Sequence, residues 1–323
     1  MGREHVVDPE REHVVDPERV HHAWDMSIEP ALVVESGDTV HFDIPMAGAG
    51  QVFEGAPFHE VQFDFDTIYN LLGPVAVHGA VPGDTLEIEI AALEPGEWGW
   101  TAILPGLGLL SDEFPDGYLK TWDLRNGVRA VLCSGVEIPF EPFLGTMGNC
   151  PDIPGVHLPF PPMKGGGNMD NRHLTVGSVL WLPVWCEGGL FSCGDPHAAQ
   201  GDGEVCVSAI ECSMRTTLRF HLRKSQISAP RFRAPGPLAS RTAASGHFAT
   251  MGISPDLMEG ARIATGEMIQ WLVEEHGLTR EDAYVLCSVA GDLKILEIVD
   301  AGVWNVSMTM PLAVFIGTGR LPG

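Results

Sequence analysis

The chain has 323 residues, of which 45% are hydrophobic and 19% are charged, and its formal net charge is −24. This acidity argues against nucleic acid or an anionic membrane surface as a partner, and it suits a small neutral substrate. No run approaches the roughly 18 apolar residues of a membrane span. The N-terminus also lacks a signal pattern, so we expect a cytoplasmic protein with no membrane partner.

A perfect tandem repeat of the octapeptide REHVVDPE occupies residues 3 to 18. A unit this short cannot be an old folded repeat, because repeat folds have periods of about 20 residues or more. We therefore expect residues 1–19 to be a frayed extension, with structure beginning near the second copy.

Two similar segments follow, SGDTVHFDI at 36–44 and PGDTLEIEI at 82–90. In each, a turn with Gly, Asp and Thr leads into alternating residues, which predicts two β-hairpins, the first formed by strands 32–34 and 40–44. We assign Asp38 and Asp84 to the turns, where a carboxylate can bond nearby backbone NH groups. Before the first strand, His22 and Asp25 are candidate site residues, although an Asp there equally suits a turn cap.

A stretch rich in Gly, Trp and Pro at 96–128 is predicted to be a long connection that covers a pocket. Trp98 and Trp100 would line this pocket, or would anchor an ordinary surface loop. Strands are expected at 129–133 and 136–140.

The segment GGGNMDNRH at 165–173 places Asn168 and Asp170 after three glycines and before a strongly apolar strand. Flexible backbone next to a carboxylate and a carboxamide is typical of a ligand-binding loop.

The densest group of ionisable residues lies in FSCGDPHAAQGDGEVCVSAIE at 191–211. Carboxylates and imidazole bind divalent cations, and its glycines permit close backbone approach. Because both flanks are apolar, we expect a loop between two buried strands; the alternative is a solvated acidic turn. This loop and 165–173 can meet if the chain folds back at Cys186 to Gly189. The candidates here are Asp195, His197, Gln200, Asp202 and Glu204.

The remainder predicts a strand pair within 213–240 and then two helices. The first helix would be capped at Ser254-Pro255-Asp256 and would end at Gly277, and the second would open at Thr279 with Asp282. Strands near 293–299 and 308–316 would complete the unit. We therefore expect an α+β, β-rich fold. It would have a mostly antiparallel sandwich or barrel-like core at 20–212 and a smaller C-terminal α/β portion at 213–323.

The seven cysteines contain no CxxC pair and are expected to be reduced. Cys193 or Cys150 as a nucleophile is an alternative, but apolar neighbours do not lower a thiol pKa. Ser192 lacks the GxSxG pattern of a serine hydrolase.

Four segments together resemble the acetamidase/formamidase family of amide hydrolases: GPVAVHGAVPGDTLEIEI, GGNMDNRHLTVGSVLWLPV, GGLFSCGDPHAAQGDGEVCVSAIE and FATMGISPDL. The likeness runs in order from about residue 20 to 317. It implies a β-rich fold with a smaller α/β portion, bound divalent metal, and hydrolysis of short aliphatic amides to carboxylate and ammonia. The chain length resembles the acetamidase branch, whereas FLGTMGNCPDIPG departs from the family's usual turn.

Chemical inference laid on these motifs gives each candidate a role. Asp170, Asp195 and His197 would hold the metal, predicted to be zinc, with His22 or Asp25 as further ligands. Glu204 would be the base, and Asn168 and Gln200 would donate to the oxyanion. The alternative is a β-rich binding protein that calcium stabilises without catalysis. A homodimer or higher homo-oligomer is expected.

Overall fold

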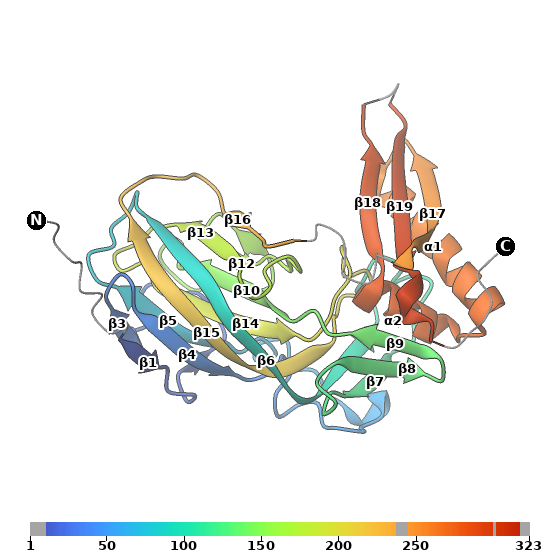
Figure 1. Ribbon diagram of the computed structural model, residues 1–323, viewed down its shortest axis with the longest axis horizontal. Helices are drawn as coiled ribbons and strands as arrows, with labels where there is room; N and C mark the ends of the chain where they lie inside the picture. Colours follow the sequence, from blue (N-terminus) through green and yellow to red (C-terminus); the bar gives the residue numbers. More distant parts are fainter. Residues whose placement is uncertain (1–10, 237–244, 300–301, 317–323) are drawn as a thin grey trace, which may run out of the picture.

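The computed structural model describes residues 11–236, 245–299 and 302–316 (Figure 1). It confirms the β-rich α+β fold: the described residues form a 14-stranded, mostly antiparallel sheet that curls into a half-barrel, a three-stranded sheet and a hairpin. The two helices pack with the three-stranded sheet at the C-terminal end of the chain. None of the helices in these ranges is long and apolar enough to cross a bilayer.

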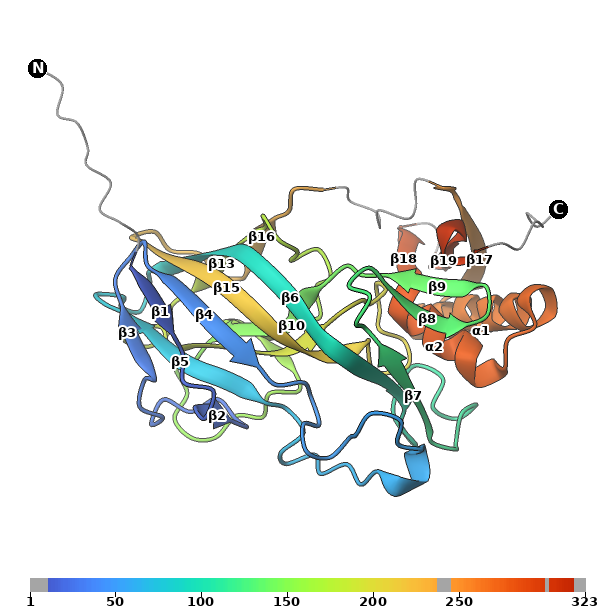
Figure 2. The ribbon, with the colours of Figure 1, turned by 60° about the horizontal axis from the view of Figure 1, so that its bottom comes forward.

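The large sheet is organised around two long strands. β6 (Thr85–Ile103) and β15 (Glu211–Arg223) pair antiparallel and run side by side along the body (Figures 1 and 2). Their apolar side chains alternate with polar ones, so one face is buried in the core. The other strands of this sheet are β1 (Glu12–Val14), β2 (Val20–His21), β3 (Leu32–Val34), β4 (Thr39–Ile44), β5 (Leu71–Val77), β7 (Tyr118–Asp123), β10 (Phe143–Asn149), β11 (Pro162–Met163), β12 (Gly166–Asn168), β13 (Val179–Pro183), β14 (Phe191–His197) and β16 (Arg231–Arg233).

The two predicted hairpins are wrong, although their strands and turns are present. β3 pairs with β5 in parallel, whereas β4 and β6 both pair with β15, so neither turn joins neighbouring strands. Apolar residues on both sides of each turn belong to the common core, and the chain therefore crosses that core instead of pairing with itself. The turn chemistry is confirmed, because Asp38 accepts from the Glu35 amide at 3.0 Å and Asp84 from the Val81 amide at 2.9 Å.

Structure begins near the second copy of the octapeptide, as expected, and this copy is part of the sheet. β1 pairs in parallel with β4, and Val15 is fully buried. His13 Nε2 lies 2.8 Å from an oxygen of Asp38, which ties β1 to the first turn. The first copy, at residues 3–10, lies outside the described residues.

The predicted connection at 96–128 is wrong in two places, because it contains the end of β6 and the whole of β7. β6 continues to Ile103, and β7 pairs with it from Trp98↔Asp123 to Ile103↔Tyr118. The aromatic residues of this stretch alternate along a strand and pack into the fold. The next two strands are confirmed as a hairpin, β8 (Arg129–Cys133) with β9 (Val136–Pro139).

In the C-terminal portion, the strands within 213–240 do not form the predicted pair, because β15 pairs with β4 and β6 while β16 pairs with β13. β15 starts at Glu211 and lies between β4 and β6, so it crosses the expected boundary at 212. The three-stranded sheet comprises β17 (His247–Ser254), β19 (Trp304–Pro311) and β18 (Asp292–Glu297), in that order. Short 3₁₀ turns occur at Phe58–Glu60 and Leu312–Val314.

The helices are α1 (Leu257–His276) and α2 (Arg280–Ala290). Asp256, and not Ser254, caps α1, because its carboxylate accepts from the amides of Met258 and Glu259 while Ser254 ends β17. The predicted stop at Gly277 is confirmed by its φ of 67°, and Thr279 caps α2 through the Asp282 amide. The buried faces of both helices join the same apolar core as the large sheet.

Candidate functional site

The predicted acidic loop begins as a strand. β14 is buried along its whole length and carries Asp195 and His197, with β10 and β5 paired on its two sides. The glycine at 194 allows this pairing, because a Cβ there would clash with the backbone of Asn70. The ring of Phe143 meets the His197 ring edge-on with centroids 5.0 Å apart. The loop proper starts only after His197.

The two predicted ligand segments, 165–173 and 191–211, do meet. Asp170, which follows β12, contributes an oxygen that lies within 4.8 Å of ligand atoms of Asp195 and His197. Gly145 of β10 lies against all three of these side chains. A Cβ built there would lie 2.6 Å from Asp170 Oδ1, 2.7 Å from Asp195 Oδ2 and 2.9 Å from His197 Cε1. Only glycine leaves room for the three side chains to converge.

A second group of possible ligands shares the same imidazole. His197, Glu204 and Glu211 also bring ligand atoms within 4.8 Å of one another. His197 Nε2 lies 3.1 Å from Glu211 Oε2 and 3.5 Å from Asp195 Oδ1. We define the acidic cluster as Asp170, Asp195, His197, Glu204 and Glu211.

Glu211 is the residue that sequence reasoning missed. It is the last residue of the segment 191–211, where the apolar residues before it indicate a buried strand and not a ligand. In the structure it opens β15 opposite His197, and its Oε1 accepts from the Ala209 amide at 2.9 Å. A carboxylate between apolar Ile210 and Cys212 in a strand that must be buried was the available signal.

The backbone at the acidic cluster adopts conformations that side chains rarely take. Asp170, Asp195 and Glu204 have φ angles of 45°, 54° and 43°, in the left-handed region. They are three of the five non-glycine residues with positive φ in the described ranges, and Val207 in the same loop is a fourth. Such strain persists only where the surroundings enforce it, and it concentrates at functional sites.

Burial and mutual repulsion shift the ionisation of these groups. Burial, followed by the charge of Asp195, raises the pKa of Asp170 to about 7. Burial, followed by the charge of Asp170, raises the pKa of Glu204 well above its ordinary value, and burial also raises the pKa of Glu211. Burial alone would lower the pKa of His197, but Glu211 and Asp195 outweigh it and raise that pKa well above 6.5. The cluster therefore binds protons or another cation strongly.

Three atoms of the cluster are buried without a hydrogen-bond partner among the described residues: Asp170 Oδ1, His197 Nε2 and Glu211 Oε2. Orphaned buried polar atoms are costly, and here all three belong to side chains that ligate divalent metals. The residues present therefore fit a divalent metal. Asp170, Asp195 and His197 would hold it, with Glu211 beside His197 as a further donor.

Gln200 connects the two ligand segments. Its Oε1 lies 2.9 Å from His197 Nδ1, and its Nε2 donates to the backbone oxygen of Asp170 at 3.0 Å. The amide oxygen can only accept, so Nδ1 of His197 carries a hydrogen. Gln200 thus orients His197, and one of the two Nε2 hydrogens that could donate to an oxyanion is already bonded to the Asp170 oxygen.

Asn168 lies at the edge of the cluster. Its Oδ1 accepts from Thr146 Oγ1 at 2.7 Å, and its Nδ2 donates to the Phe160 oxygen at 3.1 Å and to Tyr69 Oη at 3.4 Å. This arrangement fixes the carboxamide between β10 and the segment around Phe160.

The structure places the remaining predicted residues outside both ligand groups. His22 Nδ1 donates to the Tyr69 oxygen at 2.8 Å, and exposed Asp25 accepts from the Ser27 amide at 2.8 Å, as a turn cap does. Trp100 donates to the Ala47 oxygen and packs, with Trp98, in a separate apolar cluster. Asp202 lies 3.7 Å from His173 Nε2.

The C-terminal portion holds the loop that carries Glu204. Tyr284 of α2 donates to the Val205 oxygen, and Ser288 Oγ donates to the Ser208 oxygen at 2.8 Å. The Ser288 backbone oxygen also accepts from the Gly201 amide at 2.8 Å. These bonds hold the ends of the strained segment and explain how its conformation persists.

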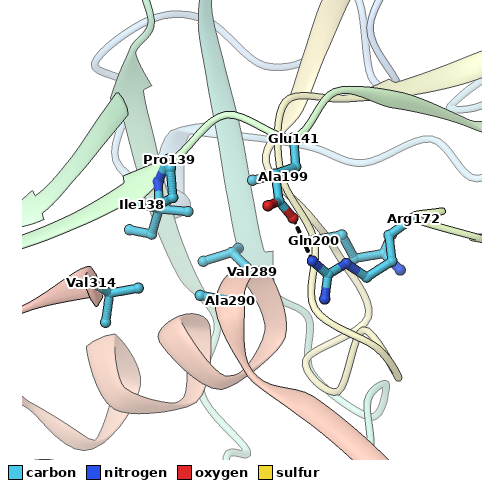
Figure 3. A pocket seen from close by; sticks show the side chains of 9 residues that line it. All are labelled: Ile138, Pro139, Glu141, Arg172, Ala199, Gln200, Val289, Ala290 and Val314. Carbon is cyan, nitrogen blue, oxygen red and sulfur yellow. Dashed lines mark hydrogen bonds and ion pairs between the residues drawn. The ribbon is translucent and has the colours of Figure 1, made fainter. Parts of the chain in front are cut away.

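A pocket lined by residues of β9, α2 and both predicted ligand segments reaches Gln200 (Figure 3). Arg172, two residues after Asp170, is buried there and bonds to Glu141 and Asp292. Asp292 Oδ1 also accepts from the Asp202 amide at 3.2 Å. The bonds from Arg172 and from the Asp202 amide to Asp292 therefore connect both predicted ligand segments to β18. The lining residues are Ile138, Pro139, Glu141, Arg172, Ala199, Gln200, Val289, Ala290 and Val314.

The nucleophile alternatives find no support in this geometry. Cys193 is fully buried, and burial raises the pKa of its thiol. Ser192 is also fully buried, and its Oγ lies 2.9 Å from His21 Nε2.

The sequence matches the pattern of the Acetamidase/Formamidase family at residues 6–155 and 158–316. An acetamidase of Mycolicibacterium smegmatis is 27% identical over 62% of this chain and 64% of its own length. A formamidase of Methylophilus methylotrophus is 25% identical over 64% of this chain and 65% of its own length. The chain thus spans just under two thirds of these relatives.

Solved structures agree in fold. A Bacillus halodurans acetamidase has a TM-score of 0.66 and 29% identity, covering 93% of this chain and 97% of its own. A gamma lactamase from Delftia acidovorans has a TM-score of 0.85 at 23% identity, covering 94% of this chain and 93% of its own. The matched residues span both the large sheet that carries the acidic cluster and the two C-terminal helices. The chain belongs to the acetamidase/formamidase family.

Proposed function

We propose that this protein hydrolyses short aliphatic amides to carboxylate and ammonia in a metal-dependent reaction. The observation that carries the proposal is the acidic cluster, in which Asp170 Oδ1, His197 Nε2 and Glu211 Oε2 are buried and make no hydrogen bond with the described residues. The names acetamidase and formamidase borne by relatives support the substrate class. Zinc is the metal we expect, because the cluster mixes one imidazole with carboxylates.

Three features of the reaction make the hydrolysis of an unactivated amide slow. Resonance makes its carbonyl a poor electrophile and its nitrogen a poor leaving group, and neutral water is a weak nucleophile. A bound divalent metal supplies a Lewis acid that polarises a carbonyl and lowers the pKa of water. The chain must supply the proton transfers and the positioning.

Glu204 is our candidate for the proton transfers. As a carboxylate it would take a proton from the attacking water while the water oxygen bonds to the carbonyl carbon. It would then give that proton to the nitrogen as the C–N bond breaks, so that ammonia leaves and the acyl group keeps the oxygen. Burial beside Asp170 raises its pKa, which suits a group that must hold a proton between the two transfers.

His197 and Gln200 would position the site. Gln200 keeps a hydrogen of His197 on Nδ1, so Nε2, which faces Glu211 and Asp195, is the nitrogen that would bind the metal. Gly145 gives the three side chains room to converge.

The test is ammonia release from acetamide and formamide. We expect turnover that is lost on exhaustive chelation and restored by zinc. Full activity in metal-free protein would contradict the metal dependence. No turnover of any short amide with metal added would favour the alternative, a binding protein stabilised by calcium. That alternative fits the cluster less well, because calcium prefers six to eight oxygen ligands, whereas the imidazole nitrogen of His197 belongs to both ligand groups of this cluster.

Two expectations stay proposals beside this one. We propose a homodimer or higher homo-oligomer and a cytoplasmic location, and size measurement in solution checks the first.

A further inference from the structure

The carbonyl oxygen of an amide gains negative charge during hydrolysis, and a donor in the protein should meet it. Asn168 and Gln200 were the expected donors, but both hydrogens of the Asn168 amide are engaged, and one of the two on Gln200 goes to the Asp170 backbone oxygen. Nδ2 of Asn168 donates to the Phe160 oxygen and to Tyr69 Oη, at 3.1 and 3.4 Å. The hydroxyl that Asn168 contacts is a further possible donor.

Tyr69 is the group to which Asn168 points. Its phenol oxygen accepts from Asn168, so its own hydrogen is directed elsewhere. Within the described ranges, no hydrogen bond takes up that hydrogen. Thr146, Asn168 and Tyr69 form a chain of donors, and each bond in such a chain polarises the next.

The phenol is held in place by its surroundings. Its ring meets the ring of Phe160 edge-on with centroids 4.8 Å apart, and the Tyr69 backbone oxygen accepts from His22 at 2.8 Å. Tyr69 as a whole residue is only partly buried.

The phenol also lies within the field of the acidic cluster. Burial, and then the charges of Asp195 and Asp170, raise the pKa of Tyr69 well above 10. The hydroxyl therefore keeps its hydrogen throughout the neutral range, as a donor must.

We propose that the Tyr69 hydroxyl donates a hydrogen bond to the acyl oxygen of the amide, and that Asn168 and Phe160 hold the phenol in position. This inference rests on the proposed function, since it names the residue that would donate a hydrogen bond to the carbonyl oxygen of the amide substrate. The bond strengthens as the C=O bond becomes a single bond and the oxygen becomes an anion. No proton is transferred, so Tyr69 is unchanged over the cycle.

The test begins with Tyr69→Phe, which removes one oxygen and keeps the ring. With acetamide we expect kcat to fall about 10²- to 10³-fold, with KM, metal content and melting temperature close to wild type. The matched control is Tyr118→Phe, because that hydroxyl bonds Asp282 at 2.7 Å, away from the acidic cluster. It should leave kcat unchanged.

A binding measurement gives a readout without turnover. Methylphosphonamidate carries tetrahedral oxygens where acetamide has a planar carbonyl, and calorimetry can measure its affinity. Tyr69→Phe should weaken this binding by at least tenfold but should leave acetate binding unchanged. Asn168→Leu should lower kcat in the wild-type background and much less in the Tyr69→Phe background, because both remove the same donor.

The outcomes separate the two proposals. Wild-type kcat and phosphonamidate affinity in Tyr69→Phe would overturn the role of Tyr69 and leave an amide hydrolase. Absence of turnover by the wild-type protein with metal added would remove the proposed function, and this donor role with it. If Tyr69→Phe does not fold, wild-type kcat in folded Asn168→Leu overturns the inference.

Discussion

The side-chain oxygen of Gln200 lies 2.9 Å from Nδ1 of His197 and fixes which ring nitrogen faces the carboxylates. Because the other end of Gln200 bonds the Asp170 backbone, one amide sets both the tautomer of a ligand and the distance between the two ligand segments. The metal site we propose depends on this residue without including it among the ligands.

Replacing Gln200 by leucine should weaken zinc binding about 10- to 100-fold, because His197 loses the acceptor that orients it. Competition with a chromophoric chelator measures the affinity directly. Gln270→Leu is the matched control, since Gln270 bonds only Glu274 on the exposed face of α1. Equal zinc affinity in the two variants would contradict the role of Gln200.

Gly145→Ala should abolish metal binding while it leaves the sheet folded. The added methyl group would occupy space within 3 Å of Asp170, Asp195 and His197, which must separate. Zinc content and ammonia release both report the loss. Gly266→Ala in α1 is the control, because a Cβ there meets nothing within 4 Å and alanine favours the helix by about 1 kcal/mol. A zinc-loaded, active Gly145→Ala protein would refute the assembly described above.

Glu204→Gln should retain zinc and lose turnover by about 10²- to 10⁴-fold, because the amide has the shape of the carboxylate but cannot carry a proton. Metal analysis and ammonia release on the same preparation separate the two effects. Glu274→Gln, which alters an exposed carboxylate on α1, should match wild type. Undiminished turnover in Glu204→Gln would transfer the role to another group, with Glu211 the nearest alternative.

The metal-free protein should become less stable as pH rises from about 4 to above 7. Asp170 has its pKa raised from 3.8 to about 7, and Glu204 and Glu211 are raised in the same direction. In this window the unfolded chain releases these protons and the folded chain retains them, so rising pH favours unfolding. The raised pKa of His197 acts with the same sign, because its stabilising proton is lost as pH rises through the folded value.

Thermal unfolding of the chelated protein from pH 4 to 8 measures how its stability depends on pH. Added zinc should weaken this dependence, because the metal replaces protons as the neutralising charge. A chelated protein whose stability climbs steadily from pH 4 to 8 would show that these carboxyl groups are not mutually repelling in the folded state.

How far the sequence predicts this molecule depends on the range of the interaction. Local chemistry was predictable: Asp38 and Asp84 bond the turn amides, and Gly277 and Thr279 mark helix ends. Strand pairing was not, because alternation shows which face is buried without showing the partner, and both predicted hairpins cross the core instead.

The candidate site divides in the same way. Asp170, Asp195, His197 and Glu204 were found because glycines and ionisable residues cluster along the chain. Glu211 and Gly145 were missed because only the register of β15 and β10 against β14 brings them to His197. Tyr69 carried no local signal either, since its neighbours in sequence are ordinary loop residues.

The bonds from Tyr284 and Ser288 to the loop that carries Glu204 bear on how the protein can be divided. A fragment ending before α2 would contain every proposed ligand and the proposed base, yet it would lack the bonds from α2 that hold the segment around Glu204. The smallest unit that could carry the proposed activity is therefore larger than the set of segments that supply its reactive groups. Exchange of the helical portion between relatives would have to preserve those bonds to preserve activity.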